Sequence, residues 1–405
     1  MEQIFNMKLI ILFVFSFFSL YSQELVQIGM GPSYEYDIYY SFDNGITAYP
    51  ERANWELAFS TDLYDGNIRI NSGGPVYLYE ISQSTKYWSQ ITSLSSDAQQ
   101  LRNSNEDWDV GAFLSNSTFD LNYGWGSYNS VNESIEGEKI YIIEYPEGQK
   151  KIRINNFYMG VFNFTIADLD GANEETIIID ASLYQNKKFI YFSLNNNQII
   201  DREPEEDNWD LLFSRYEEEY VTLNSDTMPY IVTGVLSNQN LTYEFEGPVN
   251  QNPEINLLNF NYDINTIGYD WKEYSGSFIM VPNRSYFIFN QDQTVLYKIV
   301  FESFSGQSSG NLSFYLEEIA YTPVSVIEDK VEWNIFPNPN NGNFNVTLNG
   351  SDFLVGVFDL NGKRIFSKEC TDFCNFELND FSKGIYLLKL ESQSMNIIKK
   401  IIIDN

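Results

Sequence analysis

Apolar and polar residues alternate along most of this chain, in short stretches separated by turn-forming residues. Residues 68–71, 140–145 and 286–289 are rich in Ile, Tyr and Phe and are bounded by Gly, Asn, Asp or Pro. A period of two with β-branched and aromatic residues is typical of β-strands. Amphipathic helical patterns are scarce, the best being a short one at residues 95–103. The pattern predicts an all-β protein built from antiparallel sheets.

One alternating motif occurs twice. Residues 55–60 read Trp-Glu-Leu-Ala-Phe-Ser and residues 209–214 read Trp-Asp-Leu-Leu-Phe-Ser. A similar aromatic segment precedes each copy, at 39–44 and 190–195, and Trp108 has a counterpart in Trp271. Self-similarity over so long a period indicates two copies of one domain rather than a solenoid. The repeated tryptophan fits a core anchor, because Trp, Leu and Phe share one face of a strand.

The repeat predicts two related antiparallel β domains, at residues 23–180 and 181–325. Each copy closes with a pair of aromatic strands. No clear linker separates residues 171 and 190, so one pseudo-symmetric unit is the alternative. A linker near residues 321–330, with Thr322-Pro323, precedes a last segment at 326–405.

The N-terminal residues 1–22 read as a secretory signal peptide. Lys8 precedes an apolar run at 9–20, and a small residue, Ser22, follows it. The run is shorter than the roughly 20 residues that span a bilayer. We expect export to the periplasm and no transmembrane segment in the mature chain; an N-terminal anchor is the alternative.

The C-terminal segment 326–405 carries three ordered blocks of residues. It opens with Phe-Pro-Asn-Pro-Asn-Asn-Gly at 336–342, continues with 357–363 and 381–388, and ends on a basic-apolar strand. This arrangement resembles the type A C-terminal sorting domain of the type IX secretion system. The resemblance implies a small β-sandwich, recognition by the secretion machinery, and a secreted or outer-surface location. The matching signal residues are Pro337, Asn338, Pro339, Gly342, Gly362, Gly384, Lys399 and Lys400.

Both cysteines of the chain, Cys370 and Cys374, lie in this segment. An oxidising compartment permits a disulfide, although so short a loop gains little stability from one. The pair is either a local staple or two free thiols.

Charge and composition exclude several classes of function. The net charge of −32 disfavours nucleic acid, which is bound mainly through Lys and Arg. The chain has no histidine, which excludes Ser-His-Asp triads and His-bearing zinc sites. The G-x-S-x-G motif at 306–310 therefore lacks a base and is interpreted as a polar loop between strands. Hydrolysis by paired carboxylates remains open.

Residues 188–320 suggest a family for the middle region. Blocks at 207–216, 230–236, 267–272, 297–301 and 310–314 resemble the HmuY-like haem carriers. The resemblance implies an exported all-β domain with haem as ligand. In that family two histidines hold the iron, and here a methionine thioether, from Met228, Met159 or Met280, or a tyrosinate would replace them. Each methionine can equally be core filling.

A calcium candidate surrounds Gly171. Asp168, Asp170, Asn173 and Glu175 supply oxygen donors there, without the full pattern of an EF-hand loop. The alternative is an acidic, solvated hairpin.

These features together predict an exported binding protein rather than an enzyme, with haem or another planar molecule as its ligand. The alternatives are a structural or adhesive cell-surface protein and a carboxylate-based glycan hydrolase. The oligomeric state is left open.

Overall fold

The computed structural model describes residues 23–117, 122–221, 227–321, 334–337, 340–358, 364–378, 381, 383–391 and 396–403. Every pair of strands in these ranges is antiparallel, in six sheets, which confirms the all-β class. Residues 95–103, where a short helix was expected, contain a strand, β7 (Gln99–Leu101). The predicted signal peptide, residues 1–22, and most of the predicted linker lie outside the described residues.

The first folded unit is a sandwich formed entirely by residues 57–200. A small sheet in the order β15-β14-β4-β5 packs on a larger one in the order β13-β12-β11-β10-β6-β7, which β8 and β9 extend. The strands are β4 (Leu57–Ser60), β5 (Ile68–Ile70), β6 (Tyr77–Ser82), β8 (Gly126–Asn129), β9 (Ser134–Gly137), β10 (Ile140–Tyr145), β11 (Gly148–Tyr158), β12 (Val161–Asp168), β13 (Glu175–Asp180), β14 (Phe189–Ser193) and β15 (Gln198–Ile200). Phe59, Trp125 and Phe164 are fully buried between the two sheets.

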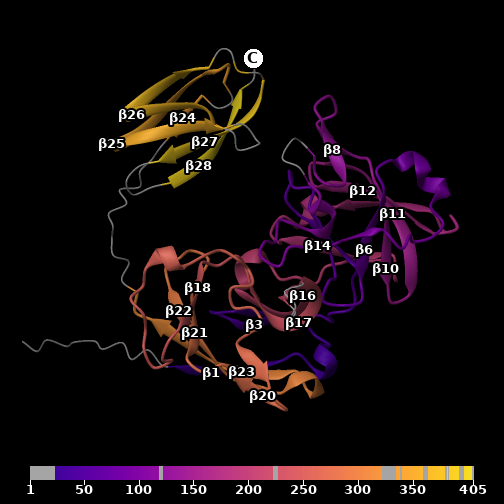
Figure 1. Ribbon diagram of the computed structural model, residues 1–405, viewed down its shortest axis with the longest axis vertical. Helices are drawn as coiled ribbons and strands as arrows, with labels where there is room; N and C mark the ends of the chain where they lie inside the picture. Colours follow the sequence, from indigo (N-terminus) through magenta and orange to yellow (C-terminus); the bar gives the residue numbers. More distant parts are fainter. Residues whose placement is uncertain are drawn as a thin grey trace, which may run out of the picture.

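The second unit is a sandwich made from both ends of the body. Its sheets run β17-β16-β2-β3 and β1-β23-β22-β21-β18, and a hairpin of β19 and β20 lies beside them. The strands are β1 (Glu24–Gly29), β2 (Ile38–Ser41), β3 (Gly45–Ala48), β16 (Leu211–Val221), β17 (Thr227–Ser237), β18 (Thr242–Glu246), β19 (Lys272–Tyr274), β20 (Phe278–Met280), β21 (Arg284–Phe289), β22 (Leu296–Phe304) and β23 (Asn311–Ile319). Figure 1 shows indigo β1 and β3 among the orange strands of the C-terminal half.

Helical structure in the described residues is limited to short 3₁₀ turns between strands. They are η1 (Pro32–Tyr34), η2 (Thr85–Gln90), η3 (Ala112–Leu114), η4 (Ala181–Tyr184), η5 (Glu206–Asn208), η6 (Leu257–Asn259) and η7 (Gly306–Ser308). The last of these, η7, carries the G-x-S-x-G motif in the loop between β22 and β23.

The two sequence copies exchange their first strands. β1 pairs with β23, and β2 pairs with β16 with Tyr40 opposite Leu211. Reciprocally, β14 pairs with β4 with Phe192 opposite Leu57, and β13, the counterpart of β1, pairs with β12. The expected boundary near residue 180 falls directly after β13, and it does not coincide with a boundary between the folded units. The first sandwich is an insertion between β3 and β16 of the second.

The exchange is symmetric at the level of single hydrogen bonds. The N–H of Met30, after β1, donates to the carbonyl of Gly310 at 3.1 Å, and that of Ala181, after β13, donates to Gly160 at 2.9 Å. Both glycines have positive φ, and a Cβ at Gly310 would lie 2.3 Å from the carbonyl oxygen of Gly31. Glycine is required at that close approach. The two halves are thus related by an approximate two-fold symmetry.

The two small sheets pack back to back. In β2, Tyr40 faces the core of the second sandwich while Tyr39 points the other way. In β16, Phe213 faces the core of the second sandwich and Leu212 points the other way, as alternation along a strand requires. The outward residues meet Ala58, Tyr191, Trp209 and others in a central cluster. The body is therefore four sheets thick, and the two middle sheets are buried on both faces.

The tryptophans at 108 and 271, paired by sequence, occupy different environments. Trp108 belongs to the central cluster between the small sheets, whereas Trp271 packs in the core of the second sandwich on Phe301, with ring centroids 3.9 Å apart. The repeated pair at 55 and 209 is equivalent, because each ring meets a tyrosine of an exchanged strand edge-on. Trp55 contacts Tyr191 and Trp209 contacts Tyr39, at 4.8 and 5.2 Å between centroids.

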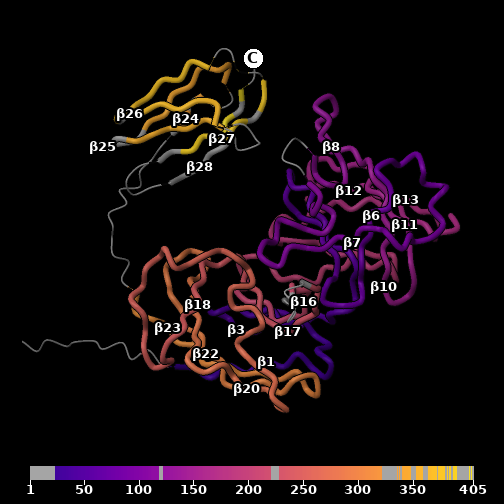
Figure 2. Tube along the Cα trace, in the orientation of Figure 1, coloured from indigo at the N-terminus to yellow at the C-terminus, as the bar shows by residue number. Residues whose placement is uncertain are grey.

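The C-terminal unit is a separate small β-structure. Its sheet runs β24 (Asn334–Phe336), β25 (Asn343–Phe358), β27 (Gly384–Glu391) and β28 (Asn396–Ile403), and β26 (Arg364–Glu377) pairs with β25. Phe344, Val355 and Ile401 are among its fully buried residues. A disulfide joins Cys370 to Cys374 within β26, with Cα atoms 5.6 Å apart. Figure 2 shows this yellow unit apart from the body.

The insertion topology makes a direct prediction for fragments. A fragment of residues 57–200 should fold alone, because both of its sheets and its core lie within that range. A fragment of residues 181–321, the expected second domain, should not, since it lacks β1 to β3. Circular dichroism with thermal melting distinguishes the two. A cooperative melt of 181–321 alone would contradict the strand exchange.

Candidate functional site

A buried polar chain crosses the contact between the two small sheets. The hydroxyls of Tyr39 on β2 and Tyr191 on β14, equivalent residues of the two copies, lie 3.3 Å apart. The Tyr191 hydroxyl donates to the carboxylate of Glu203 at 2.5 Å. Burial, followed by repulsion from Glu203, raises the pKa of both tyrosines, so they remain neutral donors.

An ion pair lies next to this chain. Arg202 donates to Asp37 at 2.7 Å, with both side chains at most 4% exposed. Ser214 donates to the other oxygen of Asp37 at 2.6 Å, and the guanidinium of Arg202 lies over the rings of Trp55 and Tyr191. Desolvation of a buried pair is costly, and further hydrogen bonds offset part of the cost. Here Ser214 and the carbonyl of Glu51 supply two of them, while Nε of Arg202 has no partner. The pair orients the contact between the two sheets.

Two carboxylates at equivalent positions of the two copies make equivalent hydrogen bonds. Glu56 accepts the N–H of Leu194 at 2.6 Å, and Asp210 accepts that of Phe42 at 2.8 Å. Each acid precedes a repeated strand and holds the turn of the hairpin exchanged from the other copy. Burial raises the pKa of both, and that of Asp210 reaches about 6.

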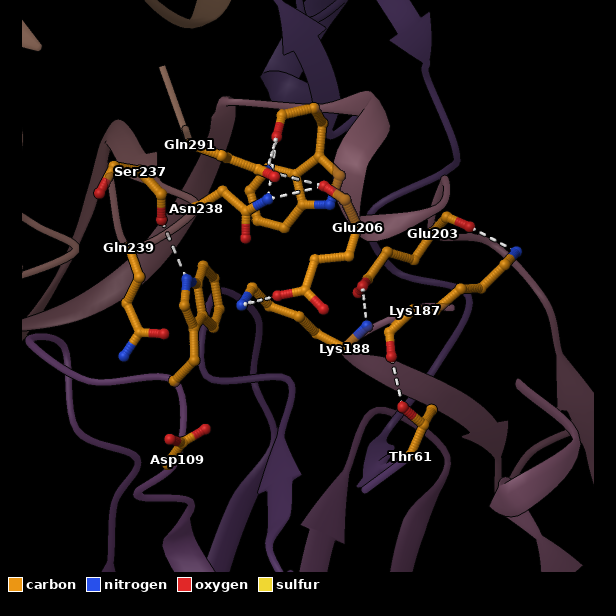
Figure 3. Close-up of polar contacts among 12 residues, drawn as sticks. Thr61, Asp109, Lys187, Lys188, Glu203, Glu206, Ser237, Asn238, Gln239 and Gln291 are labelled. Carbon is orange, nitrogen blue, oxygen red and sulfur yellow. Dashed lines mark hydrogen bonds and ion pairs between the residues drawn. The ribbon is translucent and has the colours of Figure 1, made fainter. Parts of the chain in front are cut away.

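A cleft opens at one edge of this contact. Its volume is about 670 Å³, within the usual range for ligand sites. Loops of both copies line it: Ser60, Thr61, Asp62, Leu63, Tyr64, Asp65, Trp108, Asp109, Gln185, Lys187, Lys188, Phe189, Glu206 and Gln239. Figure 3 shows Asp109 and Gln239 on one side of this region and Thr61 on the other.

Three aspartates, Asp62, Asp65 and Asp109, line the cleft. Burial, together with repulsion from Asp109 and Asp62, raises the pKa of Asp65 to about 7. Burial, then repulsion from Asp107, also raises the pKa of Asp109, which Lys188 and Arg69 partly offset. Asp65 is therefore close to half-protonated at neutral pH.

The buried polar chain holds one wall of the cleft. The second oxygen of Glu203 accepts the N–H of Lys188 at 2.8 Å, and the ammonium of Lys187 donates to the Glu203 carbonyl at 2.6 Å. The ammonium of Lys188 forms an ion pair with the carboxylate of Glu206 at 2.6 Å. These contacts are drawn in Figure 3. The carboxyl group at the sheet contact thus sets the position of the lysine-bearing loop.

The methionines proposed as haem ligands lie on separate elements. Met159 lies in the β11–β12 turn and is 39% exposed, and Met228 on β17 is 49% exposed. Met280 on β20 packs against the core of the second sandwich. They occupy three separate elements, and none of them lines the cleft described above.

The calcium candidate is an internally bonded turn. One carboxylate oxygen of Asp168 binds Lys150 at 2.8 Å, and the other accepts from Asn173 at 2.6 Å. Asp170 accepts the N–H of Ala172, and Glu175 accepts from Asn197 at 2.7 Å. The carboxylates are already engaged by protein donors. No group of three potential metal ligands occurs in the part of the chain that the structure describes.

The sorting-signal residues are only partly described. Pro337, Gly342 and Gly384 lie at or beside β24, β25 and β27. Lys399 and Lys400 pair in backbone register with Leu388 and Leu387 on β27. Asn338, Pro339 and Gly362 fall outside the described residues.

Comparison with known proteins identifies the C-terminal unit. Residues 334–404 match the family model of the secretion system C-terminal sorting domain, which confirms the predicted type IX sorting domain. Handling by the type IX secretion machinery follows, as does delivery to the cell surface or exterior. No helix among the described residues is long and apolar enough to span a membrane.

The body has no comparable match. No family model supports the haem-carrier resemblance, and the search of curated proteins found no match. A solved structure titled "Biofilm associated protein - BSP domain" aligns over 94% of this chain and 80% of that one, with 8% identity and a TM-score of 0.18. A likeness this weak carries no argument about fold or function.

Sequence reasoning missed the residues of the cleft. Asp65, Asp109, Lys188 and Glu203 come from four loops that nothing in their local sequence connects. The available signal was the repeated Trp-acid strand, because loops beside a duplicated motif meet when the copies pack together.

The buried carboxyl of Glu203 predicts how stability depends on pH. Burial raises its pKa from 4.5 to about 7. Its contribution is fully present below about pH 4.5 and is lost as the pH rises through about 7. We expect the free energy of unfolding to fall between pH 5 and 7.5, and Glu203→Gln to reduce that fall by on the order of 1–3 kcal/mol.

The matched control is Glu205→Gln, which removes an exposed neighbouring carboxylate and should leave the slope unchanged. Burial lowers the pKa of Lys272 to about 7, so this residue makes the free energy of unfolding rise with pH. Its contribution is the same in the native chain and in both variants. Urea unfolding across the pH range measures the effect. Equal slopes in the two variants would contradict the assignment.

Proposed function

We propose that this protein is a non-enzymatic binding protein that acts in adhesion at the outer cell surface or outside the cell. The observation that carries the proposal is the type IX sorting domain at 334–404, attached to a body with a cleft of about 670 Å³. The cleft is lined by loops of both copies, which the exchanged strands hold together. We assign ligand contact to this cleft.

Haem has less support as the ligand. The candidate methionines lie on separate elements, and the cleft is lined mostly by polar side chains. We expect haemin titration of the mature chain to give no Soret shift. A stoichiometric shift that Met228→Ala abolishes would reverse this ranking.

A second candidate is a carboxylate-based hydrolase of glycans. It is favoured by Asp65, whose raised pKa near Asp109 and Asp62 is the arrangement of an acid beside ionised carboxylates. A panel of chromogenic glycosides tests it. Turnover by the native chain that disappears in Asp65→Asn would establish an enzyme, and its absence supports the binding protein.

The proposed location and role are tested in a bacterium that has a type IX secretion system. A chain that stops after Tyr321 lacks the sorting domain and should be missing from the outer surface, although its body is complete. Cells producing the full chain should adhere more strongly than cells producing the truncated chain. Equal surface labelling and equal adhesion would contradict the proposal.

A further inference from the structure

We infer that the ligand of the cleft is a neutral saccharide chain. The inference rests on the proposed binding function and specifies its ligand class. The walls are preorganised, since hydrogen bonds tie lining residues of the first copy to segments of the second. The N–H of Thr61 donates to the carbonyl of Lys188 at 3.1 Å, and Trp108 Nε1 donates to that of Ser237 at 2.9 Å. A fixed cleft avoids the cost of ordering loops on binding.

The cationic groups of the cleft are already occupied. The ammonium of Lys187 binds the Asp201 carboxylate and the Glu203 carbonyl, and that of Lys188 binds Glu206. An anionic ligand such as a phosphate or a sulfated chain needs free Lys or Arg donors. The cleft is therefore poorly suited to anions.

The acidic groups are compensated in part, which disfavours a polycation. Asp62 accepts the N–H of Tyr64 at 2.7 Å, and Asp65 accepts that of Asn67 at 3.1 Å. Asp65, with its pKa raised to about 7, carries only about half a charge at neutral pH, and Lys188 and Arg69 partly offset the charge of Asp109. Each carboxylate keeps further lone pairs that can accept hydrogen bonds from uncharged hydroxyls.

The remaining lining matches a polyhydroxylated ligand. The amides of Gln185 and Gln239 each offer donors and an acceptor, which is what neighbouring hydroxyls of a sugar require. At the rim, the ring of Tyr64 is 72% exposed and presents an apolar face to the C–H side of a sugar ring. Few apolar residues line the rest, so a purely hydrophobic ligand would leave polar groups unpaired.

The experiment uses the mature full chain on an array of neutral oligosaccharides of glucose, mannose and N-acetylglucosamine. A sulfated polysaccharide and a lysine-rich peptide are included as separate arms. Titration calorimetry with the best neutral saccharide then compares variants. Tyr64→Ala and Asp109→Asn should each weaken binding about tenfold, since both groups would contact the ligand directly.

The matched control is Tyr274→Ala. Tyr274 on β19 is equally exposed, at 71%, but belongs to the second sandwich and does not line the cleft. It should bind as the native chain does, and circular dichroism checks that all variants fold.

Several results would overturn the inference: no neutral saccharide bound, binding only in the sulfated or peptide arm, or affinity unchanged in both cleft variants. The cell-adhesion assay distinguishes failure of the saccharide inference from failure of the proposed function. Adhesion that depends on the full chain, without saccharide binding, would leave the proposed function standing. Loss of surface delivery and adhesion would instead refute the function itself.

Discussion

The architecture depends on the pairing of strands between the two sequence copies. Two edges are completed in this way, β2 on β16 and β14 on β4, with equivalent residues in register. Neither small sheet has all of its strands from one copy. Because backbone hydrogen bonds within a sheet must be completed, the copies cannot separate without exposing unpaired strand edges. Strand exchange thus converts a tandem repeat into one interlocked body.

The same pairing explains why the central contact carries polar groups. Two sheets buried on both faces leave little room for solvent, yet Tyr39, Tyr191 and Glu203 meet there. Each of these groups has a hydrogen-bond partner, and Arg202 and Asp37 bind each other, although Nε of Arg202 has no partner. A buried polar network of this kind fixes the relative position of two apolar surfaces that could otherwise slide. Glu203, the last residue of this network, also accepts the N–H of Lys188 and so positions the wall of the cleft.

Export and body structure fit together. The sorting domain is a compact unit with its own core and its own disulfide, and none of its strands pairs with a described strand of the body. It can therefore serve delivery while the body keeps its fold. The strongly acidic composition suits a protein that works outside the cell, where solubility must come from the chain itself.

Much of the fold could be predicted because it depends on local patterns. Alternation with period two indicated strands throughout, and the repeated Trp-acid-Leu motif indicated two copies. The sorting domain was recognisable because its signal lies in contiguous blocks. The helix expected at 95–103 failed, since pairing of β7 with β6 outweighs a weak helical preference.

What the sequence by itself determined is therefore the class of fold and the delivery signal, and its repeated motif predicted a duplication. Only the tertiary structure decided which copy each strand completes, because β1 and β2 would alternate in the same way beside either copy. The cleft, too, was decided only there. Asp65, Asp109, Lys188 and Gln239 are distant in sequence, and they converge only because the exchanged strands place the loops of both copies at one edge.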